Sequence, residues 1–108
     1  TMMMTGFGRS TLGETLKAHG ALVTADPYPE QRFFERSDNY SLAVRGVVAH
    51  TISGWAVTPT YHTPDDTLAN LDIAFMTRAI QSLVEPLRAL ANSDARPQWK
   101  PGGKPEGK

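Results

Sequence analysis

The chain has 108 residues, of which 40% are apolar and 20% are charged, so it is long enough for one small domain. Eleven basic and eleven acidic residues give no net charge, which argues against a strongly basic nucleic-acid-binding protein. The lack of cysteine excludes disulfides, cysteine-based zinc sites and a thiol nucleophile. No apolar run reaches the length of a membrane helix, so we expect neither nucleic acid nor a membrane as a partner.

The first elements expected along the chain are a helix and a short strand. Ser10 is a suitable cap for a helix that runs to His19 and stops at Gly20. Residues 21–24 are apolar and favour a short strand. Residues 26–30 form an irregular spacer, because each of their two prolines restricts its own backbone and that of the preceding residue.

The middle of the chain predicts a short helical turn and a second strand. Ser37 and Asp38 offer capping side chains for a turn that reaches Val44, and Gly46 ends it. Residues 47–52 are too short for a helix and rich in β-branched side chains, so they predict a buried strand.

A long loop and a long helix follow. Residues 53–70 contain glycine and proline among small polar residues and predict a loop of roughly eighteen residues, far above the usual length of about four to six. An amphipathic helix from near Asp72 to near Asn92 should then bend or divide at Pro86, which lacks an N–H group. The predicted core face of this helix consists of Ile73, Met76, Ile80, Leu83, Val84, Leu87 and Leu90.

The sequence divides into a body, residues 1–94, and a tail, residues 95–108. The tail contains three of the four lysines together with several prolines and glycines, and it has no apolar periodicity. We expect it to be disordered or extended, because it cannot bury enough apolar surface to offset the entropy of ordering it. The body supplies too few strands to pair with both edges of the strand predicted at residues 47–52. We therefore interpret it as part of a larger α/β domain.

The densest group of functional side chains is YHTPDDT, residues 61–67. One interpretation is a surface turn, because Thr-Pro-Asp-Asp is good turn chemistry. The other is a metal-binding histidine, His62, beside a hydroxyl, Tyr61, since imidazole is a common zinc ligand and a phenol can donate to a developing oxyanion.

Several segments together resemble a known family. They are FERSDNY at 34–40, GVV at 46–48, YHTPDDT at 61–67 and LD at 71–72. In this order and spacing they resemble the zinc exopeptidases related to bacterial leucyl aminopeptidase, glutamate carboxypeptidase II and glutaminyl cyclase. The resemblance implies an α/β fold, namely the C-terminal portion of a three-layer α/β/α zinc-peptidase domain with a mixed sheet, here incomplete. It also implies a peptide substrate, and related enzymes are often periplasmic or secreted.

The resemblance also assigns roles to single residues. It makes His62 the last protein ligand of a two-zinc site and Tyr61 the hydroxyl that steadies the tetrahedral oxyanion. Cyclase-like relatives typically carry Trp before this histidine, so Tyr61 favours the peptidase branch. Asp38 would line the site and orient its neighbours, with helix capping as the alternative. His50, a strand histidine, and His19, a solvent-facing residue at a helix end, match no ligand position.

The sequence departs from the family pattern in two ways. It has no His-x-Asp and no Glu-Glu pair, and the family draws its bridging metal ligand and general base from these motifs. We therefore expect the C-terminal segment of a zinc-dependent aminopeptidase, which hydrolyses N-terminal peptide bonds, with the isolated chain inactive. The alternative is a non-catalytic interaction module of peptidase-like fold. Exposed strand edges and an uncovered helix stripe would favour self-association or pairing with the missing part of the domain.

Overall fold

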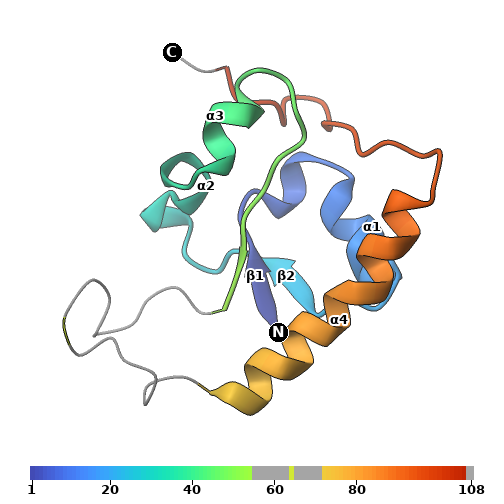
Figure 1. The fold of residues 1–108 in the computed structure, drawn as a ribbon. Coiled ribbons are helices and arrows are strands. Elements are labelled where there is room, and N and C mark those ends of the chain that lie inside the picture. The colour runs from blue at the N-terminus through green and yellow to red at the C-terminus, as the bar shows by residue number, and fades with distance from the viewer. Residues whose placement is uncertain (55–63, 65–71, 107–108) are drawn as a thin grey trace.

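The computed structural model describes residues 1–54, 64 and 72–106. These residues form a mixed sheet with strand order β2-β1-β3, in which β2 runs parallel and β3 antiparallel to β1 (Figure 1). The predicted α/β class with a mixed sheet is confirmed, and a sheet of this kind is consistent with a portion of a larger α/β domain. The strands are β1 (Met2–Met4), β2 (Val23–Ala25) and β3 (Ile52–Ser53). The helices are α1 (Leu12–Ala18), α2 (Phe33–Arg36), α3 (Asn39–Ala43) and α4 (Ile73–Ala91). Single 3-10 turns lie at Phe7–Arg9 and Pro29–Gln31.

The central strand, β1, is one that the sequence pattern did not predict. Its three methionines are at most 6% exposed, so both faces of the strand are covered. Unbranched methionine is not a strong strand former, and only the neighbours on both sides give this segment its extended conformation. β1 therefore supplies the sheet partner that the sequence analysis found missing.

The buried strand predicted for residues 47–52 is wrong for most of its length. Only Ile52 joins a strand, and Val47 is 52% exposed. Side chains hold part of the preceding backbone, since the Thr51 N–H donates to Thr5 Oγ1 at 3.0 Å and the Ala49 carbonyl accepts from Asn39 Nδ2 at 3.3 Å. The Thr51 carbonyl accepts from the Thr5 N–H at 2.9 Å. Backbone groups occupied in this way do not form a continuous ladder with a neighbouring strand.

The first helix forms close to where the sequence predicts it. The Leu12 N–H donates to Ser10 Oγ at 3.2 Å, so Ser10 acts as a capping side chain just before α1. Gly20 follows the helix with a φ of 102°, a conformation that glycine adopts without a steric cost. The chain then turns back into β2, which begins two residues later and ends one residue later than the sequence indicates.

The main core lies between the sheet and helices α1 and α4. It is built from the buried Met2, Leu16, Ala21, Val23 and Ala79, against which partly buried side chains pack: Phe7, Leu12, Ile52, Phe75 and Leu83. Figure 1 shows α1 and α4 side by side, with α2 and α3 grouped away from them on the other side of β1. The two helix groups are therefore organised around the small sheet.

Helix α4 has the predicted bounds, but its predicted core face is only partly correct. The Asp72 side chain caps it by accepting from the Phe75 N–H at 2.9 Å, and Pro86 is buried without dividing the helix. Five of the seven side chains in the predicted face are exposed by 40–57%: Ile73, Met76, Ile80, Val84 and Leu87. The helix packs through a neighbouring face, which carries the buried Ala79 together with the partly buried Phe75 and Leu83.

Among the described residues, no helix combines the length and apolar character that crossing a membrane requires.

The described part of the tail, residues 95–106, is attached to the body of the chain. Trp99 forms an antiparallel bridge with Ser10, and the Lys100 N–H donates to the Arg9 carbonyl at 2.8 Å. The Trp99 indole N–H donates to the Gly46 carbonyl at 3.0 Å, so the tail is extended but attached to the body. The composition of the tail suggests that burial of apolar surface cannot offset the entropy cost of ordering it. The backbone hydrogen bonds that it shares with the body offset part of that cost. In Figure 1 the tail runs from the end of α4 to the region of α3.

Candidate functional site

The predicted site residues fall in two different parts of the chain. Tyr61 and His62 lie outside the described residues, so their predicted roles stay predictions. The structure places the residues that precede and follow this segment, with Ser53 paired to β1 and Asp72 at the start of α4.

Asp38 lies at the start of α3, where its side chain is exposed. The backbone around it is helical, with φ −61° and ψ −23°, and its carboxylate makes no capping hydrogen bond. The backbone carbonyl of Asp38 instead accepts from the Ser41 hydroxyl at 3.2 Å. The capping alternative for this carboxylate is therefore not observed, and the carboxylate is left accessible.

Asn39, the next residue, holds this turn in place, a role that the sequence analysis did not assign. It is 6% exposed, and its Nδ2 donates to the carbonyls of Phe34 and Ala49, both at 3.3 Å. Its Oδ1 accepts from the Thr51 hydroxyl at 2.7 Å. Asn39 therefore links α2, α3 and the segment before β3, and this fixes the position of the neighbouring Asp38. An asparagine after Ser-Asp is the only sequence signal for this role.

Phe34 organises the side chains beneath this turn. Its ring meets those of Tyr40 and Trp99 edge to face, with centroids 6.1 and 6.5 Å away, and lies 5.7 Å from the His50 ring. The Arg9 guanidinium lies 4.4 Å from the centroid of the Phe34 ring, a cation–π contact. This cluster joins residues from five separate segments, so sequence periodicity could not reveal it.

His50 is a titratable member of this cluster, in contact with the rings of Phe34 and Trp99. Its Nδ1 lies 2.8 Å from the Thr5 carbonyl and its Nε2 lies 2.8 Å from Ser10 Oγ. A carbonyl can only accept, so Nδ1 carries the proton and Nε2 accepts from the Ser10 hydroxyl, which in turn accepts from the Leu12 N–H. Ser10 is 0% exposed, so this serine–histidine pair cannot meet a substrate.

The surroundings of His50 keep it neutral. Burial lowers the pKa of His50 below its ordinary value, and the positive charge of Arg9 acts in the same direction, while the bond to the Thr5 carbonyl opposes them. Because both ring nitrogens are already hydrogen-bonded, His50 has no free lone pair for a metal. His19 lies exposed at the end of α1 with its Nδ1 2.9 Å from the Thr15 carbonyl, as the sequence predicts.

Within residues 1–54, 64 and 72–106, no three histidine, aspartate or glutamate side chains come together as a metal cluster. Zinc sites use about three or four protein ligands, so this part of the chain does not fit a zinc ion by itself. In this part of the chain, Asn39, Phe34 and His50 form a well-packed cluster that holds the turn carrying the exposed Asp38.

Comparison with known proteins gives one finding. The sequence model of peptidase family M28 matches residues 4–97, a range that includes Asp38, Tyr61 and His62. No curated protein and no solved structure matches the chain. Because the family match covers most of the 108 residues, the chain belongs to peptidase family M28 and its parent protein is a hydrolase of the metallopeptidase class.

Proposed function

We propose that the chain is the C-terminal segment of a zinc-dependent aminopeptidase that hydrolyses N-terminal peptide bonds. The observation that carries the proposal is the family match over residues 4–97, which includes the Tyr61-His62 pair. In the complete site, His62 is a metal ligand, and the Tyr61 hydroxyl donates a hydrogen bond to the oxyanion of the tetrahedral intermediate. Asp38 orients groups at the edge of the site from its fixed position at the start of α3.

The chain needs partners for this chemistry. It has no His-x-Asp and no Glu-Glu pair, so the bridging carboxylate and the general base that a two-metal peptidase needs come from outside these residues. The isolated chain is accordingly inactive, and His62 alone gives at most weak zinc binding. The specific kinship to bacterial leucyl aminopeptidase, rather than to the cyclases, rests on Tyr61.

The test uses the chain alone and the chain complemented by a family M28 segment that carries His-x-Asp and Glu-Glu. We expect turnover of aminoacyl substrates only in the complemented protein. Turnover should be abolished by His62→Ala, reduced by Tyr61→Phe with little change in KM, and unaffected by the control His19→Ala. Robust turnover by the isolated chain that His62→Ala abolishes would disprove the claim of incompleteness. Full turnover by complemented His62→Ala would disprove the metal-ligand role.

The exposed face of α4 favours a second candidate, an interaction module that pairs with another copy of the chain. Its five exposed side chains, Ile73, Met76, Ile80, Val84 and Leu87, follow a spacing of three, four, four and three residues, which is symmetric about Ile80. Two antiparallel copies of such a helix can interdigitate around a two-fold axis. In the complete peptidase, the missing part of the domain would occupy this face instead.

Ile80→Glu tests this pairing. A charge at the centre of the contact should convert a self-associating chain into a monomer, because an unpaired carboxylate is costly to bury. Sedimentation velocity across a concentration series measures the change, with Gln81→Glu as the control on the neighbouring exposed position. A wild-type chain that stays monomeric throughout the series would rule out association through α4.

A further inference from the structure

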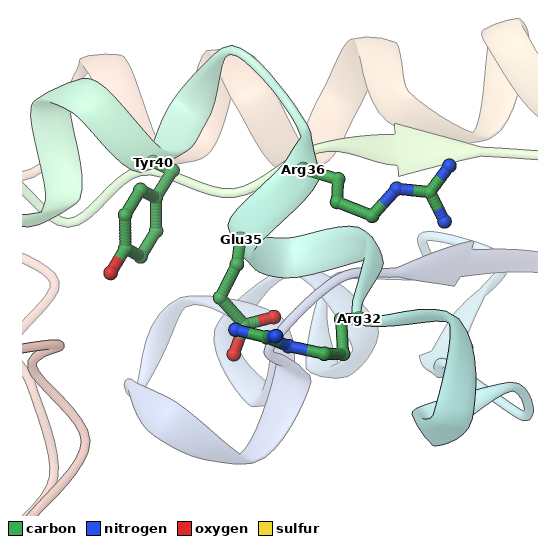
Figure 2. Close-up of a pocket in the computed structure, with 4 residues that line it drawn as sticks. All are labelled: Arg32, Glu35, Arg36 and Tyr40. Carbon is green, nitrogen blue, oxygen red and sulfur yellow. The ribbon is translucent and has the colours of Figure 1, made fainter.

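The structure contains a second feature, which the peptidase proposal does not use. A pocket of about 360 Å³ lies along α2 and α3, lined by Arg32, Glu35, Arg36 and Tyr40 (Figure 2). The lining carries two guanidinium groups and one carboxylate, and Arg9 outside the lining pairs with that carboxylate, so positive charge is in excess here. A pocket with this excess suits an anionic ligand.

Two of the four side chains already have partners. Arg36 donates to the Gln31 carbonyl at 2.9 Å and lies over the Phe33 ring at 5.6 Å, and Figure 2 shows it pointing away from the other three. Glu35 forms an ion pair with Arg9 at 3.6 Å, so its charge is partly compensated. These two residues form walls of the pocket.

The other two side chains are available. Within the described part of the chain, the Arg32 guanidinium makes no ion pair and the Tyr40 hydroxyl makes no hydrogen bond. The Tyr40 ring is held edge to face against Phe34, with centroids 6.1 Å apart. This contact fixes the orientation of the ring and hence the position of its hydroxyl. A phenol hydroxyl can donate a hydrogen bond to an anion.

The backbone of Arg32 is strained where it forms this pocket. Arg32 has φ 55° and ψ 42°, and among the described residues it is the only non-glycine residue with a positive φ. This left-handed conformation is unfavourable for a bulky residue, and such strain gathers at ligand-binding positions. Arg32 thereby stands directly before α2, one turn ahead of Arg36.

We propose that this pocket binds the carboxylate group of a small monoanionic ligand. The Arg32 guanidinium pairs with both carboxylate oxygens, and the Tyr40 hydroxyl donates a further hydrogen bond. Glu35 selects against dianions such as hydrogen phosphate, because a second negative charge on the ligand is repelled by its carboxylate. The proposal concerns binding only and does not depend on peptide hydrolysis.

The experiment is a titration of the full chain, followed by amide chemical shifts at pH 8, where most inorganic phosphate is the dianion, with acetate, benzoate, inorganic phosphate and neutral benzamide. Acetate and benzoate should shift the signals of Arg32, Glu35 and Tyr40 saturably, with a Kd on the order of millimolar for so open a site. Phosphate should bind more weakly than acetate, and benzamide should not bind. The proposal fails if acetate shifts no signal in the pocket, or if phosphate or benzamide binds as well as acetate.

Arg32→Asn is the sharpest variant, because asparagine tolerates the left-handed conformation while lacking the charge. Acetate binding should weaken about tenfold or more, whereas the control Arg45→Asn removes an exposed arginine elsewhere and should leave it unchanged. Arg32→Lys should bind with intermediate affinity, since lysine keeps the charge without the planar fork. If Arg32→Asn does not fold, Arg32→Gly provides the same test, and unchanged affinity in either folded variant overturns the assignment.

Discussion

Replacing Gly103 by alanine should release the tail and lower the free energy of unfolding by about 1–3 kcal/mol. Gly103 is buried, and a Cβ atom built on it would overlap the backbone oxygen of Arg9. That oxygen already accepts from the Lys100 N–H, and the Arg9 side chain donates to the Gly103 carbonyl at 3.0 Å. A backbone atom held from both sides cannot yield as a flexible side chain would, so the tail must move instead.

Urea unfolding and the fluorescence of Trp99, measured in a Trp55→Phe background, report this release. The emission of Trp99 should shift toward that of a solvent-exposed indole as its contacts with His50 and Phe34 are lost. Gly8→Ala is the matched control, because nothing lies within 4 Å of the position of its Cβ. If Gly103→Ala unfolds at the same urea concentration as Gly8→Ala and keeps the emission of Trp99, the tail is not attached as described.

Acidification should destabilise the protein through His50. The pKa of His50 is lowered in the folded state, so below about pH 6.5 the unfolded chain binds a proton more readily than the folded chain does. The stabilisation is therefore fully present above that pH and is lost as the pH falls below it, by at most about 1.4 kcal/mol per pH unit for one proton. The main cause is burial, which disfavours the charged imidazolium, and a protonated Nε2 can in addition no longer accept from Ser10.

The measurement is the free energy of unfolding between pH 5 and 8 for the wild type, His50→Gln and the control His19→Gln. The slope between pH 5 and 6.5 should decrease in His50→Gln and persist in His19→Gln. His50→Ala should also cost about 2–4 kcal/mol at pH 7.5, because Ser10 and the Thr5 carbonyl lose a buried partner. An identical slope in the wild type and His50→Gln would show that His50 does not control the acid response.

The helices show which features the local sequence pattern can predict. Helix α4 forms where its apolar period and the Asp72 cap predict it, and α1 forms between Ser10 and Gly20, because capping and periodicity act within a few residues. The period of α4 could not show which of its apolar side chains would be buried. That choice depends on what lies opposite the helix, and here small residues such as Ala79 pack against the core while Ile80 stays exposed.

The sheet shows where local pattern fails. Three methionines form the central strand, although their β-propensity is modest, while the β-branched residues around Val47 stay largely outside it. Strand formation depends on which segments meet in space, and residues about twenty and fifty positions apart in the sequence meet at β1. The same reason explains why the composition of the tail did not reveal its attachment at Arg9.

The sequence by itself determined the α/β class, the positions of α1 and α4, and the segments that link the chain to peptidase family M28, since these depend on short-range periodicity and on the identity of residues in order. Only the tertiary structure decided that Asn39 anchors the turn carrying Asp38, that His50 is locked between Thr5 and Ser10, and that Arg32 and Tyr40 share a pocket. Each of these depends on contacts between segments that are separated in the sequence or on a backbone angle imposed by packing, which residue order alone does not specify.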